Sequence, residues 1–340
     1  MNNYFFLILI PLIFIVNYIL TKKKILLNYT GQKHQVYTYK NQVPLSGGIF
    51  IILFFIININ YLEVNLIIFF FIFFIIGLFT DLNIIKSPSL RFLIQILFLI
   101  FFIINFDLSI NDIRIDILNI FLENYYFNIF FVLFCLLVLV NGSNFIDGNN
   151  CLAIGYFLII YLAITNLYFN NNIYLEISML TYFLITLFIL LIFNLFNKLY
   201  LGDNGIYLLS IYTGFTLIIL FKNNPEFSPY FIVNLLWYPA FEILFSMLRK
   251  LSVKFSPMEP DILHLHQLIY YYFNKKFKYK KKILNSLTGI SINIYNFIII
   301  YFASINIYNT KNQILFLSIS LSIYLLSYIF FLNYKKLSRK

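Results

Sequence analysis

Residues 126–150 read YFNIFFVLFCLLVLVNGSNFIDGNN, and this stretch combines the two features that decide the fold. Its first fifteen residues are apolar or aromatic except for Asn128. A run of this kind approaches the length of a helix that crosses a hydrocarbon layer of about 30 Å. The ten residues that follow, 141–150, are rich in Asn and Gly. The stretch therefore predicts a membrane helix that ends in a polar segment.

Apolar blocks like this one recur along the whole chain of 340 residues. Hydrophobic residues make up 61% of the sequence and charged residues 11%, whereas a soluble domain has about 25% charged residues. This composition excludes a water-soluble globule. Only helices and closed barrels satisfy their backbone hydrogen bonds in lipid, and the blocks lack the alternation of barrel strands. We expect one domain, residues 1–340, that is an all-α polytopic membrane protein.

The apolar blocks predict about eleven transmembrane helices, because each block approaches the length of a membrane span. The predicted spans are 4–20, 45–60, 64–79, 90–106, 126–142, 151–169, 176–193, 205–221, 230–247, 283–303 and 313–333.

The basic residues predict the orientation of these spans. If alternate loops lie on one side, all 24 Lys and Arg residues except Arg114, Lys222 and Lys311 fall on that side. The positive-inside rule makes this side cytoplasmic, with the N-terminus outside and the C-terminus inside. Topology and anionic lipid account for the net charge of +11. The basic residues are dispersed over loops between spans, which argues against a nucleic-acid partner.

Three acidic residues stand at helix ends on the predicted cytoplasmic side. Asp81, Asp147 and Asp203 each end or begin a predicted span, in three different inner loops. Ionisable groups at membrane depth are costly and usually functional. Mg²⁺ typically takes one or two carboxylates together with substrate phosphates, so the three carboxylates indicate a site for a divalent cation and a phosphate. Taken singly, each also fits an ordinary helix end or turn.

The neighbours of these carboxylates support a ligand site. Asn141, Asn144 and Asp147 are spaced three apart, so on a helix they share one face. Gly202 and Gly205 flank Asp203, where glycine lets the backbone approach a ligand closely. A helix N-terminus at this point would favour an anion.

Two of the three histidines stand in the longest inner loop, as His264 and His266. A spacing of two puts both rings on one side only in an extended backbone, so we expect this stretch to be extended. Tetrahedral zinc needs more ligands than this loop offers. We expect these histidines to bind a phosphate group instead. The alternative is that they stand in a polar loop and have no function.

For two further features, a structural explanation is at least as good as a functional one. The glycines of 46–48 permit close helix packing through small residues as well as contact with a ligand. Glu242 stands seven residues before Arg249 on one helix face, and a structural ion pair is favoured over catalysis there.

This ordered set resembles the polyprenyl-phosphate N-acetylhexosamine-1-phosphate transferases, which are membrane enzymes of glycosyltransferase family 4. The matching stretches are 44–48, 77–95, 141–155, 201–205 and 239–268. Each stretch is weak alone, and the order of all five on one predicted face carries the resemblance. The family starts the lipid-linked synthesis of bacterial O-antigen (lipopolysaccharide), teichoic acid or murein, as part of cell wall biogenesis. It implies a multi-pass protein of the bacterial inner membrane with a cytoplasmic active site.

The resemblance implies transfer of a sugar-1-phosphate from a UDP-N-acetylhexosamine to polyprenyl (undecaprenyl) phosphate, with release of UMP. Mg²⁺ is the implied cofactor, with Mn²⁺ as a substitute, and a homodimer stays open. By this resemblance Asp203 and Asn144 are the metal ligands. The implied catalytic residues are Asp81, Asp147, Asp203, His264 and His266. The implied substrate-binding residues are Lys33, Lys86, Arg91 and Asn141.

Three positions depart from the family pattern. Thr80 replaces the first of two adjacent aspartates, Asn150 replaces the second aspartate of Asp-Gly-x-Asp-Gly, and Gln267 replaces the last histidine of His-x-His-His. The murein-precursor branch, which transfers phospho-muramoyl-pentapeptide, typically has three adjacent histidines, so the N-acetylhexosamine branch is favoured. An inactive relative with a structural role is a further alternative.

A polytopic transporter or lipid flippase is the rival from another class. Transporters usually show repeated halves and broken helices near the midplane. The polar motifs of this chain instead gather at one predicted face, which favours the enzyme.

Overall fold

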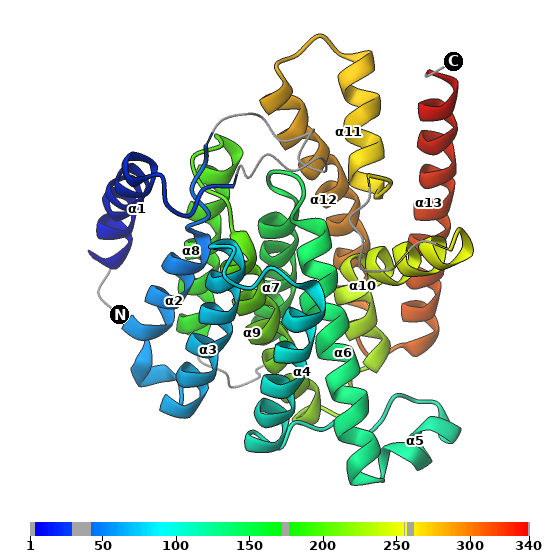
Figure 1. Ribbon diagram of the computed structural model, residues 1–340. Helices are drawn as coiled ribbons and strands as arrows, with labels where there is room; N and C mark the ends of the chain where they lie inside the picture. The colour runs from blue at the N-terminus through cyan, green and yellow to red at the C-terminus, as the bar shows by residue number, and fades with distance from the viewer. Residues whose placement is uncertain (1–3, 29–41, 172–176, 255, 257–261, 339–340) are drawn as a thin grey trace.

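The computed structural model describes residues 4–28, 42–171, 177–254, 256 and 262–338. The protein is all-helical over these residues, as its composition predicts (Figure 1). The helices are α1 (Tyr4–Lys23), α2 (Gly47–Ile57), α3 (Val64–Asp81), α4 (Pro88–Asn105), α5 (Asp116–Leu122), α6 (Tyr125–Ile146), α7 (Leu152–Asn171), α8 (Ile177–Leu195), α9 (Gly202–Lys222), α10 (Pro229–Ser252), α11 (Leu265–Lys276), α12 (Lys281–Ile305) and α13 (Thr310–Leu337).

Each of the eleven predicted spans coincides with one of these helices, while α5 and α11 lie in loops where no helix was expected. Within the described residues, eight helices are long and apolar enough to cross a membrane: α3, α4, α6, α8, α9, α10, α12 and α13. Helix α2 and the described part of α7 are apolar but shorter. The number eleven and the orientation of the termini therefore stay predictions.

Local sequence sets where several helices begin. Ser87 accepts the backbone N–H of Leu90, and Pro88 follows as the first residue of α4. Asn124 accepts two backbone N–H groups at the start of α6. Asn309 caps α13 in the same way. Such caps supply partners for N–H groups that the helix itself leaves open, so these starts are encoded by neighbouring residues.

Helix α9 is the centre of the bundle, and 83% of the residues in its apolar 18-residue stretch are buried. It packs against α2, α3 and α6. Glycines make the closest approaches possible: a Cβ on Gly77 would lie 2.4 Å from the Cα of Asn204, and one on Gly48 would lie 2.6 Å from the nitrogen of Gly205. The packing explanation for residues 46–48 is thus confirmed, since small residues let these helix backbones approach.

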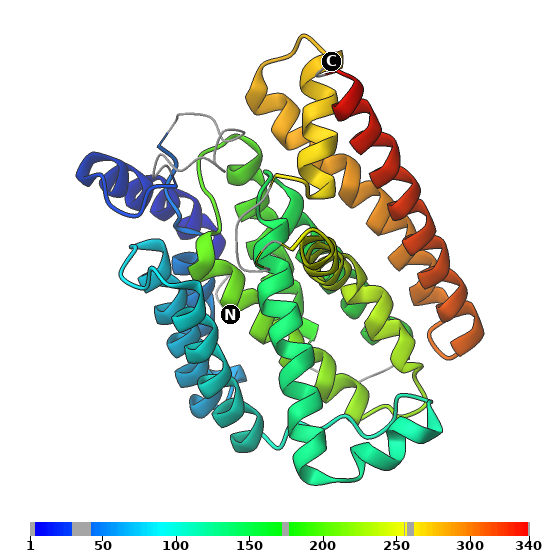
Figure 2. The same ribbon diagram turned by 45° about the vertical axis from the view of Figure 1, so that its right-hand side comes forward.

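The polar helix ends meet at one end of the bundle, drawn uppermost in Figures 1 and 2. The connection between α3 and α4, the end of α6, the start of α9 and the start of α11 all lie toward this end, while α5 lies at the opposite end. Helix α10 contains Pro239 and bends, so that Figure 2 shows its second part nearly end-on. Proline removes a helix hydrogen bond and kinks the axis, which accounts for the change of direction within α10.

Candidate active site

A carboxylate from α3 holds the N-terminal end of α9. Asp81 ends α3, and its two oxygens accept the backbone N–H groups of Asp203 and Asn204, each at 3.0 Å. The side chain of Asn204 also donates to this carboxylate. Gly202 has a φ of +72°, and a Cβ there would lie 2.7 Å from the Asp81 oxygen. Asp81 therefore caps the N-terminus of α9 across the helix interface. Only glycine fits at position 202, because of its positive φ and its closeness to the Asp81 carboxylate.

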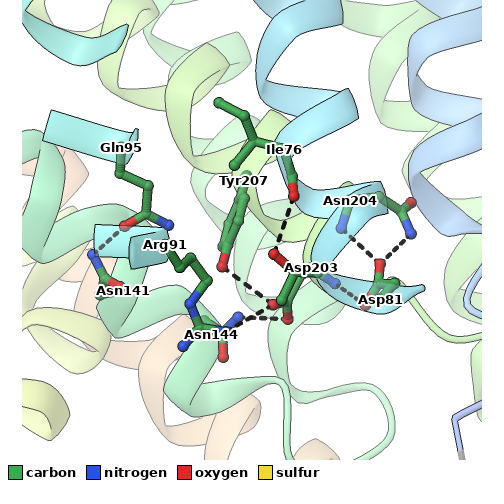
Figure 3. A network of polar contacts seen from close by, with 10 residues as sticks. Ile76, Asp81, Arg91, Gln95, Asn141, Asn144, Asp203, Asn204 and Tyr207 are labelled. Carbon is green, nitrogen blue, oxygen red and sulfur yellow. Dashed lines mark hydrogen bonds and ion pairs between the residues drawn. The ribbon is translucent and has the colours of Figure 1, made fainter. Parts of the chain in front are cut away.

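Asp203 projects from the first turn of α9 into a ring of hydrogen-bond donors (Figure 3). Its Oδ2 accepts from the Arg91 guanidinium at 3.1 Å and from the Tyr207 hydroxyl at 3.1 Å. Its Oδ1 accepts from Nδ2 of Asn144 at 2.7 Å. The side chains of Arg91 and Asp203 are 29% and 21% exposed, so a ligand can still reach the pair.

Two rows of side chains on α4 and α6 continue this network into the bundle. Arg91 and Gln95 are four residues apart on α4, and Asn141 and Asn144 are three apart on α6. Both spacings place their members on one helix face, and the Asn141 amide donates to Gln95 Oε1 at 3.1 Å (Figure 3). Asn141 thus binds Gln95, about one helical turn along α4 and α6 from the ring around Asp203.

Asp147 adds a third carboxyl group directly after the end of α6. It is half-buried, and the pKa of its carboxyl lies well above the usual range. Burial is the main cause, and the negative charges of Asp203 and Asp81 add to it. The carboxyl groups at the end of α3, after α6 and in the first turn of α9 thus lie near enough to repel one another.

His264 and His266 stand at the start of α11. His264 precedes the helix with extended backbone, and His266 lies in the first turn, so the expected extended stretch is helical from Leu265 onward. The two imidazoles stack with their centroids 5.6 Å apart and their planes at 7°. A Cβ on Gly148 would lie 2.6 Å from Nε2 of His266. The rings therefore adjoin the segment that follows α6.

The expected ion pair between Glu242 and Arg249 is wrong. Glu242 instead accepts from His264 Nδ1 and from the backbone N–H of Leu265, each at 3.1 Å. Arg249 donates to the hydroxyl of Ser246 at 3.2 Å. Seven residues along a helix are separated by about 10.5 Å, and the start of α11 offers Glu242 nearer donors.

Of the two predicted binding lysines, Lys86 alone lies within the described residues. Lys33 lies outside the described residues. Lys86 is exposed in the connection between α3 and α4, at the same end of the bundle as Asp81.

The positions that depart from the family pattern have structural partners. The Thr80 hydroxyl donates to the carbonyl of Ile76 within its own helix, at 3.0 Å. Asn150 is buried, donates to Ser286 at 3.2 Å and accepts from Asn285 at 3.3 Å. Asn150 therefore fixes the connection between α6 and α7 to α12, and it does not offer its oxygen to the carboxylate cluster. Gln267 accepts the backbone N–H of His264 at 3.3 Å.

Sequence reasoning missed three members of the network. Tyr207 follows Asp203 by four residues and Gln95 follows Arg91 by four, so helical spacing was the signal that could have found both. Asn204 stands beside Asp203, but only the position of Asp81 shows what its amide binds.

The donor set fits Mg²⁺ only together with a ligand. Among the described residues, no group of three or more His, Cys, Asp or Glu side chains is arranged to hold a metal ion by itself. Asp203 and Asp147 nevertheless offer carboxylate oxygens, and Asn144 offers an amide oxygen beside them. Mg²⁺ commonly takes one or two carboxylates and completes its shell with substrate phosphates and water.

Part of this chain is similar in sequence to known proteins. Residues 63–221, a little under half of the chain, match the family described as glycosyl transferase family 4. Over 71 residues the chain is 34% identical to the undecaprenyl-phosphate alpha-N-acetylglucosaminyl 1-phosphate transferase of Thermotoga maritima. This match covers 21% of the chain and 23% of that relative. The family match contains Asp81, Arg91, Asn144 and Asp203.

Proposed function

From the match of residues 63–221 to glycosyl transferase family 4, we propose that this chain transfers a sugar-1-phosphate from a UDP-N-acetylhexosamine to polyprenyl phosphate. An oxygen of the polyprenyl phosphate attacks the β-phosphorus of the UDP-sugar. The bond from that phosphorus to the bridging oxygen breaks, and UMP leaves with its electron pair. The product is a lipid-linked sugar diphosphate, the first intermediate of a cell-surface polysaccharide.

One observation carries this proposal: Asp203 lies between Arg91 and Asn144, beside the Asp81 carboxylate, at one end of an apolar bundle. A lipid substrate in the bilayer and a nucleotide in water can meet only at such an end. The relative from Thermotoga maritima carries undecaprenyl phosphate and N-acetylglucosamine in its name, which supports the same classes of substrate here.

Charge explains the choice of residues. Phosphoryl transfer needs positioning and charge stabilisation more than covalent chemistry. Arg91 brings a fixed positive charge, and the carboxylate of Asp203, the amide oxygen of Asn144 and the carboxyl group of Asp147 would hold Mg²⁺. When bound, Mg²⁺ supplies charge neutralisation of the diphosphate. By the charge rule for loops, we assign this end of the bundle to the cytoplasmic face of a bacterial inner membrane.

The test uses membranes that contain the protein, polyprenyl phosphate, Mg²⁺ and a panel of radiolabelled UDP-sugars. We expect label from one UDP-N-acetylhexosamine to enter butanol-extractable lipid, with an equal amount of UMP formed. Nucleotide binding without transfer from any UDP-sugar would instead favour an inactive relative. Movement of intact lipid across the bilayer without UMP would favour a flippase.

Removal of divalent cations is expected to stop the reaction. EDTA should lower the rate by about 100-fold or more, because two anionic substrates must then meet without charge neutralisation. Excess Mg²⁺ or Mn²⁺ should restore the rate, whereas Ca²⁺, with longer bonds and looser geometry, should restore it poorly. A rate that is unchanged in EDTA would remove the metal from the proposal.

Asp147→Asn is expected to stabilise the protein while it lowers activity. A carboxyl group with a raised pKa binds its proton more tightly in the folded than in the unfolded protein, so its ionisation destabilises the fold as the pH rises above the ordinary pKa. Asparagine removes this penalty. Thermal unfolding in detergent should show a higher midpoint than wild type at a pH well above the ordinary pKa of an aspartate, which is about 3.9, and a smaller difference close to that value. An unchanged midpoint at both pH values would contradict the cost of ionising this carboxyl group, which burial and the neighbouring negative charges impose.

A further inference from the structure

Glu242 is a buried acid that the proposed reaction does not use. It lies in α10, is 1% exposed, and binds two donors from the start of α11. One oxygen accepts the backbone N–H of Leu265 and the other accepts from Nδ1 of His264, each at 3.1 Å. Burying a carboxylate is costly unless it is paired and hydrogen-bonded. An uncharged side chain would fill the same space at lower cost, so the charge calls for an explanation.

A chain of contacts leads from Glu242 to the carboxylate cluster. The ring of His264 stacks on that of His266, and the edge of His266 lies against Gly148. Phe145 contacts the His264 ring with centroids 5.0 Å apart in an edge-to-face arrangement. Both imidazoles therefore contact the segment 144–148, which includes the last residues of α6 and the turn that follows it, with Asn144 and Asp147.

The contact also fixes which nitrogen of the His264 ring carries a proton. A carboxylate has only acceptor oxygens, so Nδ1 must carry the proton that it donates to Glu242. Nε2 is then the nitrogen left for a ligand. A carboxylate that binds one ring nitrogen is a common way to fix the tautomer and orientation of a functional histidine.

We propose that Glu242 is a positioning residue for the proposed transfer: it orients His264, and through it His266, toward the phosphates of the nucleotide sugar. This proposal rests on the proposed function. It assigns the buried acid of α10 to the histidine pair of α11 and explains why α11 begins where it does.

Glu242→Gln separates the two contacts of this side chain. Glutamine can still accept the Leu265 N–H through its oxygen, so the start of α11 is kept. Its NH2 group then faces Nδ1 of His264 and can only donate, which moves the ring proton to Nε2. We expect kcat to fall by about 10–100-fold with a smaller change in KM for the UDP-sugar. Glu242→Asp, which retains the charge, should recover part of this loss.

Asn234→Leu is the matched control. Asn234 is also a fully buried polar residue of α10, but it binds the carbonyl and side chain of Gln313 in α13. Its loss should lower the unfolding midpoint while kcat of the folded protein stays near wild type. If Asn234→Leu lowers kcat as much as Glu242→Gln does, the effect of Glu242 is merely structural and the proposal fails.

A double-mutant cycle tests the link to the ring. In a His264→Asn background, Glu242→Gln should lower kcat by less than about 2-fold, because coupled residues do not add. A full additional loss would overturn the proposal.

A spectroscopic measurement keeps the result independent of turnover. The chain has three histidines, so ¹⁵N spectra of histidine-labelled protein can be assigned with the His264→Asn variant. Wild type should show a protonated Nδ1 for His264, and Glu242→Gln should show this signature lost. If no UDP-sugar is turned over, the proposed function fails, but these spectra still show whether Glu242 binds Nδ1 of His264. Identical spectra for wild type and Glu242→Gln would overturn the positioning role.

Discussion

Asp203→Asn is expected to abolish measurable sugar-phosphate transfer, a loss of about 1000-fold, while the protein still inserts into membranes. The substitution keeps the size of the side chain but removes its charge and one of its two acceptor oxygens. Arg91, Tyr207 and Asn144 all donate to this carboxylate, so the new NH2 group must face a donor. The assay is the transfer of label from UDP-sugar to butanol-extractable lipid.

Stability should change little in this variant, since the pair with Arg91 is partly exposed and such pairs contribute about 1 kcal/mol or less. Asp107→Asn is the matched control. Asp107 is 83% exposed in its side chain, pairs with Lys222 at 3.1 Å, and lies at the other end of α9 from Asp203. It should transfer at the wild-type rate. Wild-type rates from Asp203→Asn would remove the site assignment.

Asp81→Asn is expected to lower both activity and stability. Asp81 accepts from the backbone of Asp203 and Asn204 and from the amide of Asn204. Asparagine offers one acceptor oxygen to these donors, and an unsatisfied buried group costs about 1–3 kcal/mol. The start of α9 should loosen, and Asp203 should move out of its ring of donors. We expect transfer to fall by about 100-fold and the unfolding midpoint in detergent to fall with it.

The combined loss distinguishes Asp81 from Asp203, whose substitution should affect activity almost alone. Thr80→Val is the control for Asp81, because the Thr80 hydroxyl donates to the Ile76 carbonyl of its own helix and does not hold the start of α9. It should leave both measurements near wild type. An Asp81→Asn protein with an unchanged midpoint would show that Asp81 does not cap α9.

The fold class could be predicted because it depends on local composition. Runs such as 126–140 must leave water and must satisfy their own backbone groups in lipid, so helices were the only outcome. Caps such as Asn124 mark helix starts for the same local reason. Helix α11 was missed because its 12 residues are too few for a membrane span and because its start depends on Glu242, which lies 23 residues earlier than the N–H that it binds.

The site could be predicted in part. The polar helix ends were visible as breaks in an apolar sequence, and the charge rule placed Asp81, Asp147 and Asp203 on one face. The partners of Glu242 and Asn150 could not be predicted, because each is bound by a helix distant in the sequence. For Glu242 the helical spacing pointed to Arg249, and the bend of α10 together with the position of α11 gave a different partner.

The sequence by itself determined that this chain is a helical membrane protein and that its ionisable residues stand at helix ends, since burial of apolar runs and the cost of charge in lipid act residue by residue. Only the tertiary structure decided which of these ends meet. The close packing of Gly77 and Gly48 on α9 brings the Asp81 carboxylate to N–H groups 122 and 123 residues away. A hydrogen bond forms only within about 3 Å, and only the packing of the helices brings these groups that close.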